Sequence, residues 1–274
     1  QRFPLPWLAD TPALNRPFGV AQYQEATAHL AITGMVHVEA NVAPQFALLE
    51  AQWAAAQARH DPRLRAIVAA APIEFGEQSR VYLEALRAVS PLIVGVRRNL
   101  QSEPDPAYCL RPDFIQGIHL LAAYGFSFDI CIRHDQLAAV TTLARQCPEV
   151  SFILDHLGKP AIKRQQLDPW RDQLAAFAAL PNVACKISGL VTEADQARWQ
   201  PEDLAPYVAH TLAAFGPDRV LFASDWPVLL QAASYQRWAE TLDTLTVQLS
   251  SDHRRQLWGE NARRWYRLPP ATRE

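Results

Sequence analysis

Short apolar runs alternate with helical patterns along most of the chain. Seven runs are bounded by turn residues and have the length and composition of buried strands; they cover residues 35–40, 64–73, 92–100, 126–132, 150–160, 182–190 and 220–228. The segments between and around them predict helices over 21–31, 44–59, 76–89, 112–124, 135–146, 169–180, 201–215 and, after the last strand, about 233–249 and 252–265. This alternation indicates parallel strands whose two sheet faces are both covered by helices.

The number and order of these units predict the fold class. Seven strands follow a helix that has no strand before it, so we expect an α/β fold, a (β/α)8 TIM barrel whose first strand is absent from the chain, forming one domain over 1–274. A doubly wound open sheet is the alternative, disfavoured because no strand leads into a GxGxxG loop. The proline-rich stretch 1–19 predicts an extended loop. Trp7 within it would either anchor this loop or line a pocket.

Composition indicates which binding partners and which cellular compartment to expect. The 274 residues carry a formal net charge of -2, without a long basic run, so we expect a small-molecule substrate rather than nucleic acid. No apolar run is long enough for a membrane span, which favours a cytoplasmic protein without a membrane partner. The four cysteines show no CxxC spacing and predict reduced, buried thiols. A homo-oligomer stays open.

Polar side chains gather where the expected strands end. In a barrel these ends meet at one rim, where active sites form. The rim residues would be Glu39, Arg97, Arg98, Asn99, Asp129, Arg133, Asp155, His156, Lys159, Lys186, Ser188 and Asp225. Because side chains alternate along a strand, we expect only one of Asp155 and His156, and only one of Arg97 and Arg98, to face the site.

His156 and Asp225 form the pair that makes chemical sense. Aspartate can take a proton from water while histidine and a nearby cation polarise a carbonyl, with or without a divalent metal ion between them. A structural ion pair is the alternative. His37 and Glu39 share a strand face and would either bind a metal or, as we favour, include a buried, hydrogen-bonded histidine. Trp226 would stack on a sugar ring or pack under a loop.

Several long motifs resemble one family. They are DHLGKP (155–160), KISGLVTEA (186–194), FGPDRVLFASDWPV (215–228) and GENARRWYRL (259–268), with HVEAN (37–41), GVRRNLQ (95–101) and the opening PWLAD. These motifs resemble the amidohydrolase-related family of sugar-lactone and 2-pyrone-4,6-dicarboxylate lactonases. The resemblance implies a TIM-barrel hydrolase that opens fucono-, rhamnono- or galactarolactone or a dicarboxylate lactone. It also implies that Asp225 is the general base and that His156 contacts the substrate carbonyl or a metal.

The resemblance leaves alternatives and one departure. A decarboxylase or amide hydrolase of the same superfamily, or a non-catalytic barrel that binds sugar acids, would also fit. The family carries an HxH pair at the end of its first strand, and this sequence begins just after that place, so we expect truncation, processing or unobserved residues there. We expect no required cofactor, or one weakly bound zinc or manganese ion held by His156 and Asp225. The expected substrate-binding residues are Glu39, Arg97, Asn99, Lys186 and Trp226.

Overall fold

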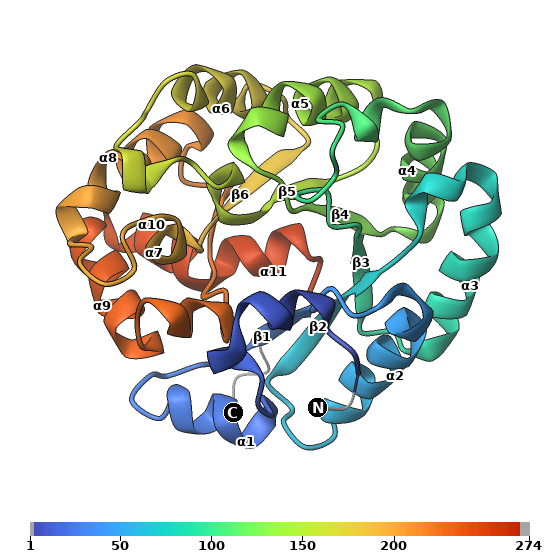
Figure 1. Cartoon of the computed structure of the whole chain (residues 1–274), viewed down its shortest axis with the longest axis horizontal. Helices are drawn as coiled ribbons and strands as arrows, with labels where there is room; N and C mark the ends of the chain where they lie inside the picture. The colour runs from blue at the N-terminus through green and yellow to red at the C-terminus, as the bar shows by residue number, and fades with distance from the viewer. Residues whose placement is uncertain (1–2, 269–274) are drawn as a thin grey trace.

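A computed structural model describes residues 3–268 and contains seven parallel strands in one curled sheet (Figure 1). The strands are β1 (Met35–Val38), β2 (Leu64–Ala70), β3 (Ile93–Arg97), β4 (Ser127–Ile130), β5 (Phe152–Leu154), β6 (Val183–Ile187) and β7 (Val220–Phe222). Each strand pairs with the next along the chain. Each strand lies within one of the seven expected runs, but the runs over 150–160 and 220–228 contain strands of only three residues each. Residues 1–2 and 269–274 of the expected domain lie outside the described residues.

Helices follow the strands and form an outer layer around the sheet (Figure 1). The α-helices are α1 (Val20–Ala26), α2 (Ala47–Gln57), α3 (Ser79–Val89), α4 (Pro112–Tyr124), α5 (Leu137–Gln146), α6 (Trp170–Ala178), α7 (Leu190–Glu193), α8 (Pro201–Phe215), α9 (Tyr235–Leu245), α10 (Ser251–Arg255) and α11 (Asn261–Trp265). A π-helical turn over Gln256–Glu260 interrupts the expected helix 252–265. Within residues 3–268, no helix combines the length and the apolar character that crossing a bilayer requires.

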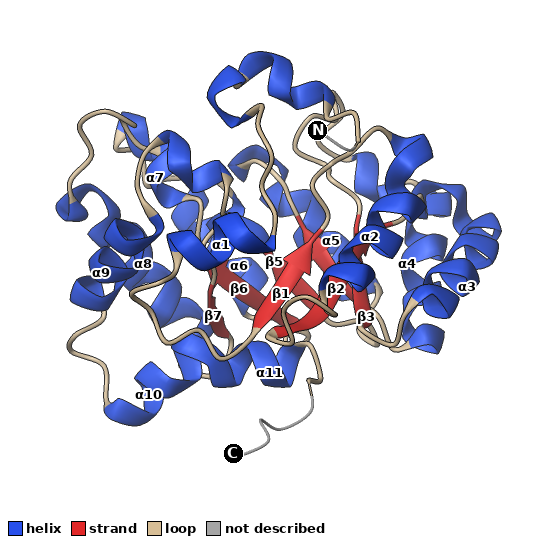
Figure 2. Ribbon diagram, turned by 90° about the horizontal axis from the view of Figure 1, so that it is seen from below, coloured by secondary structure: helices blue, strands red, loops and turns tan. Residues whose placement is uncertain are grey.

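The N-terminal segment is less extended than expected. It contains two short 3-10 helices, Pro6–Asp10 and Pro12–Leu14. Each begins at a proline, whose fixed φ suits a first helical position where no N–H is needed. Trp7 Nε1 donates a hydrogen bond to the Ala40 carbonyl at 2.9 Å, which confirms Trp7 as an anchor. Since Ala40 follows β1, this segment lies over the carboxyl ends of the strands (Figure 2).

The sheet buries apolar residues on both faces. Its outer face packs against the helices, as the edge-to-face contact between Phe128 and Phe114 of α4 illustrates. Its inner face forms a separate cluster of Val68, Ile153, Ala184 and Leu221, which Tyr266 completes. Tyr266 follows α11, which lies at the amino ends of the strands (Figure 2). The C-terminal helix therefore closes the floor, and the opposite end is left for polar groups.

A register shift between β2 and β3 places Arg97 on the inner face of the sheet. The pairing of β2 with β3 runs from Ile67 opposite Ile93 directly to Val68 opposite Gly95. Gly95 and, two residues on, Arg97 therefore share the inner face with Val68. A Cβ at Gly95 would lie 2.2 Å from Ser127 Oγ of β4, so only glycine allows these strands to approach.

The described strands form a curled half-barrel. In residues 3–268, β1 pairs with β2 alone and β7 with β6 alone. The uninterrupted order of seven parallel strands, each followed by helical segments, is consistent with a (β/α)8 barrel and differs from that of a doubly wound sheet, whose strand order reverses.

Candidate functional site

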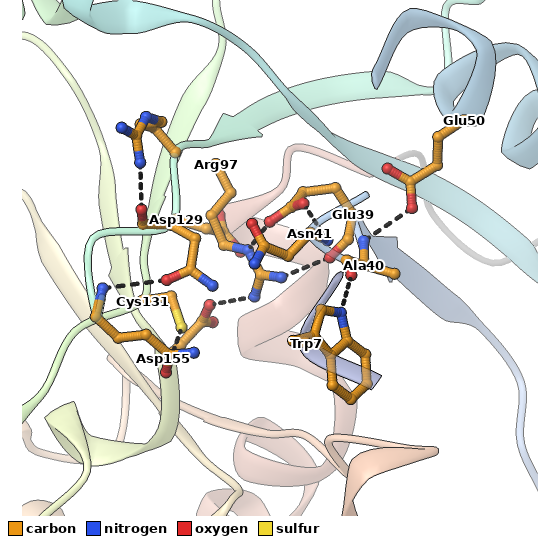
Figure 3. A network of polar contacts seen from close by, with 12 residues as sticks. Trp7, Glu39, Ala40, Asn41, Glu50, Arg97, Asp129, Cys131 and Asp155 are labelled. Atoms are coloured by element: carbon orange, nitrogen blue, oxygen red, sulfur yellow. Dashed lines mark hydrogen bonds and ion pairs between the residues drawn. The ribbon is translucent and has the colours of Figure 1, made fainter. Parts of the chain in front are cut away.

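Two cations and three carboxylates form a buried network inside the strand ends. Arg97 Nε contacts Glu39 Oε1 at 2.5 Å, and its Nη1 contacts Asp155 Oδ2 at 2.9 Å. Lys186 Nζ lies 2.7 Å from Asp155 Oδ1 and 2.5 Å from Asp129 Oδ2. Figure 3 shows Arg97 between Glu39 and Asp155, with Asp129 beyond. The network therefore joins residues on or directly after five different strands, β1, β3, β4, β5 and β6.

Charge pairing offsets the cost of burying these groups. Burial lowers the pKa of Arg97 and of Lys186, but the adjacent carboxylates raise both pKa values well above their usual range, so both side chains stay charged. For Asp155, burial is outweighed by Lys186 and Arg97, and its pKa is lowered. Burial raises the pKa of Asp129 instead, although Lys186 and the Tyr266 hydroxyl donate to it. The positive charges of the network are thus matched internally.

His156 and Asp225 meet beside this network. His156 Nε2 lies 3.5 Å from Asp225 Oδ1, and His156 Nδ1 lies within hydrogen-bond distance of Ser188 Oγ, at 2.8 Å. Burial lowers the pKa of His156, against the raising effect of Asp225. The imidazole is therefore neutral near neutral pH. The side chain of Asp225 is 17% exposed, so solvent or a substrate can reach it.

The backbone after each strand directs these side chains. His156 has φ 54° and Asp225 has φ 58°, in the left-handed region that non-glycine residues rarely adopt. The expectation that Asp155 and His156 face opposite ways is wrong, because β5 ends at Leu154 and strand alternation stops there. Asp155 enters the network and His156 turns to Asp225. Gly189 makes room, since a Cβ there would lie 2.8 Å from the His156 side chain.

At the end of β3, in contrast, side chains do alternate as expected. Arg98 points away from Arg97 and pairs with Glu74 at 2.8 Å and Glu103 at 2.6 Å, so one arginine is structural, as expected. Asn99 Oδ1 accepts a hydrogen bond from the Gln101 backbone and stabilises a turn.

Trp226 and His37 pack among other aromatic side chains. Trp226 contacts Phe18 and Tyr23 edge-to-face, each at 5.3 Å between ring centroids. This contact corresponds to the second alternative given for Trp226, packing under a loop. His37 faces Trp53 of α2 at 6.1 Å. Its Nε2 atom is buried, as expected, but the expected hydrogen bond is absent for this atom among the described residues. His37 points to the helix layer, whereas Glu39 beyond the strand end turns to Arg97.

Metal-ligating atoms come close together at the same place. Ligand atoms of Cys131, Asp155 and His156 lie within 4.8 Å of one another. Both Asp155 oxygens already bind cations. The 3.5 Å between His156 Nε2 and Asp225 Oδ1 matches the separation of about 3.4 Å between two tetrahedral zinc ligands. The donor types fit zinc.

A family comparison identifies the chain. A model of a family described as amidohydrolase matches residues 1–268, which is nearly the whole sequence. The chain belongs to the amidohydrolase family. An amidohydrolase from Burkholderia multivorans, whose crystal structure contains bound Zn, has 32% sequence identity and a TM-score of 0.88. The match covers 96% of this chain and 94% of that one.

Curated amidohydrolase relatives carry lactonase names. An L-fucono-1,5-lactonase from Burkholderia multivorans is 40% identical over 195 residues, which is 64% of this chain. The aligned part spans 63% of the length of that relative. An L-rhamnono-gamma-lactonase from Scheffersomyces stipitis is 24% identical over 75% of this chain and 69% of its own length. The resemblance drawn from the motifs is confirmed.

The structure adds residues to which the sequence assigned no role. Ser188 and Lys159 were expected at the rim without a function, and Gln101 and Glu193 were not singled out. Lys159 Nζ donates to Gln101 Oε1 at 2.5 Å, and Glu193 Oε1 lies 3.9 Å away. The scarcity of lysine, with three in the whole chain, is the one sequence signal that pointed to Lys159.

Proposed function

We propose that this amidohydrolase opens the ring of a sugar-acid lactone by adding water to the ester carbonyl. The observation that carries the proposal is the pairing of Asp225 Oδ1 with His156 Nε2, 3.5 Å apart at the carboxyl ends of β7 and β5. A carboxylate and a neutral imidazole at this separation can act on opposite partners of one reaction, the attacking water and the carbonyl oxygen.

Asp225 acts as the general base. It accepts a proton from water while the water oxygen bonds to the lactone carbonyl carbon, and the carbonyl oxygen takes the negative charge. The tetrahedral intermediate then collapses, the bond from this carbon to the ring oxygen breaks, and the ring oxygen receives the proton from Asp225. The product is an open-chain hydroxy acid. The partial exposure of Asp225 leaves room for the water.

His156 polarises the carbonyl. We assign the Nδ1 position as the acceptor of a hydrogen bond from the Ser188 hydroxyl, because this places the imidazole proton on Nε2, toward the carboxylate of Asp225. An Nε2–H group there donates to the carbonyl oxygen as charge develops on it. The pKa of His156, lowered by burial, keeps this tautomer neutral and ready at neutral pH.

A divalent ion would bind weakly. His156 and Asp225 would hold it, with Cys131 nearby, and the ion would supply polarisation of the carbonyl. Both oxygens of Asp155 are already paired with cations, and the Lys159 ammonium, which has no carboxylate within hydrogen-bond distance, opposes a metal charge near these donors. We expect hydrolysis to persist after dialysis against a chelator. Complete loss of activity that zinc or manganese restores would contradict this expectation.

The substrate class follows from the relatives and from the internal charge balance. The named relatives are an L-fucono-1,5-lactonase and an L-rhamnono-gamma-lactonase, whose names denote lactones of sugar acids. Arg97 and Lys186 are paired with buried carboxylates, which favours an uncharged, hydroxyl-rich ring over a dicarboxylate. Glu39 Oε1 and the Glu39 carbonyl accept from Arg97, and Oε2 accepts from the Asn41 backbone N–H. Glu39, Asn99 and Trp226 stay predicted substrate contacts.

Acid release from a panel of aldonolactones tests the proposal. Wild-type enzyme should hydrolyse at least one 1,5- or 1,4-lactone, and Asp225→Asn should lower kcat by about 10² to 10⁴-fold, the usual contribution of general acid–base catalysis. Asp172→Asn provides a matched control, because Asp172 lies exposed at the start of α6. An Asp225→Asn enzyme as fast as wild type would exclude the proposed base.

A further inference from the structure

Lactone hydrolysis creates negative charge that the buried cations Arg97 and Lys186 are not free to stabilise. The carbonyl oxygen becomes an oxyanion in the intermediate, and the product carries a new carboxylate. Arg97 donates to Glu39 and Asp155, and Lys186 donates to Asp129 and Asp155. Each cation is thus held between two acidic side chains. Diverting either of them to a substrate would leave buried carboxylates unpaired, at high cost.

Lys159 differs from Arg97 and Lys186 because it is partly exposed and hydrogen-bonds to a neutral group. Its side chain is 19% exposed, and its Nζ donates to Gln101 Oε1, which belongs to a neutral amide. The nearest carboxylate oxygen, Glu193 Oε1, lies 3.9 Å away, which is too far for a hydrogen bond. An ammonium group has three donors. Two of them are therefore available for a ligand, and Glu193 is a distant ion-pair partner at 3.9 Å rather than a hydrogen-bond acceptor.

Lys159 lies in the same turn of the backbone as His156, one member of the proposed catalytic pair. The Lys159 backbone N–H donates to the His156 carbonyl at 2.8 Å, and Lys159 adopts a left-handed φ of 53° that continues the turn begun at His156. The charge of Lys159 acts on both His156 and the nearby thiol of Cys131. The amide of Gln101 holds the ammonium by a hydrogen bond, and Glu193 Oε1 lies 3.9 Å from it. The turn after β5 thus carries both His156 and a partly exposed cation.

We propose that Lys159 is a catalytic residue of the lactonase reaction, binding the carbonyl oxygen as it becomes negative and then the carboxylate of the product. The inference rests on the proposed function and extends it to a residue outside the Asp225 and His156 pair. Lys159 shares the oxyanion with His156 Nε2: the histidine donates a hydrogen bond, and the ammonium supplies the opposite charge. The proton inventory of the reaction is unchanged, because Lys159 stays protonated throughout.

Charge-removing and charge-keeping variants test this role. Lys159→Met keeps the apolar stem and removes the charge, and Lys159→Arg keeps the charge. We expect Lys159→Met to lower kcat by about 10² to 10³-fold with a small change in KM, as for the loss of an oxyanion donor. Lys159→Arg should recover most of kcat. Lys163→Met is the matched control, since Lys163 is an exposed lysine four residues further on, and it should match wild type.

A binding measurement separates this inference from the proposed function. Calorimetric titration with the open-chain aldonate should show anion binding by wild type and by Lys163→Met, and at least tenfold weaker binding by Lys159→Met. If wild type hydrolyses no lactone, the proposed function fails, while this titration still tests the cation. The inference on Lys159 is overturned if Lys159→Met retains wild-type kcat and aldonate affinity, or if a folded Lys159→Arg is as impaired as Lys159→Met.

Discussion

Removing the charge of Lys186 should strongly destabilise the protein. Lys186 is 6% exposed, and its Nζ lies between Asp129 and Asp155 at 2.5 and 2.7 Å. In Lys186→Met, the methionine fills a similar volume but leaves Asp129 with the Tyr266 hydroxyl and Asp155 with Arg97 as partners. Breaking a buried ion pair from one side costs about 3 to 5 kcal/mol, because the other charge stays buried. That is a large part of a total stability of about 5 to 15 kcal/mol.

Equilibrium unfolding in urea measures this loss. With a denaturant slope of about 3 kcal/mol/M for a chain of this size, the midpoint should fall by about 1 to 1.7 M. Asp129→Asn added to Lys186→Met should recover part of the shift, because the second change removes one of the two carboxylates that lost a partner. The surface pair of Arg198 and Asp195 provides the control, and Arg198→Met should leave the midpoint unchanged.

The outcome can refute the reasoning directly. If the midpoint of Lys186→Met falls by less than about 0.3 M, the network does not depend on the cation for its stability. If the double variant is less stable than Lys186→Met, the uncompensated charge of Asp129 is not the source of the loss. The circular dichroism spectrum before denaturation should match that of wild type, because the apolar stem still packs inside the sheet.

Two further changes probe the orientation of His156 and a buried acid. Ser188→Ala should lower kcat by up to about tenfold, because one hydrogen bond that orients the imidazole is lost; a wild-type kcat would argue against that role. Burial, and then the charge of Glu39, raise the pKa of Glu50 from 4.5 to about 7. The folded state therefore binds the proton more tightly, and this stabilisation, complete below about pH 4.5, disappears as pH rises through 7. Glu50→Gln should thus gain up to about 3 kcal/mol on wild type between pH 5 and 8, and parallel pH profiles of unfolding would contradict this.

Local pattern was sufficient for the elements of the fold. Continuous apolar runs located all seven strands, because a strand covered on both faces has no polar side to interrupt its run. The expected bounds Pro112–Tyr124 agree with α4, since a proline suits the first helical turn and Gly125 ends the helix in a left-handed conformation. The long motifs were enough to identify the amidohydrolase family, which the match over residues 1–268 confirms.

Strand alternation correctly predicted the opposite orientations of Arg97 and Arg98 but failed for Asp155 and His156. Arg97 lies inside and Arg98 outside, because both are governed by the regular geometry of β3 and its end. Asp155 and His156 follow the end of β5, where a left-handed backbone replaces alternation. A sequence pattern carries the period of an element but not the dihedral angles of the residues just beyond it.

The sequence by itself determined which chemical groups stand at the strand ends, since hydrophobic periodicity defines where each strand stops. Only the tertiary structure decided which cations are neutralised, because that depends on distances between strands far apart along the chain. Arg97 and Lys186, both expected to bind substrate, are surrounded by buried carboxylates, while Lys159 has none in direct contact. Coulomb energy and desolvation vary over a few ångströms, a scale that spacing along the chain does not encode.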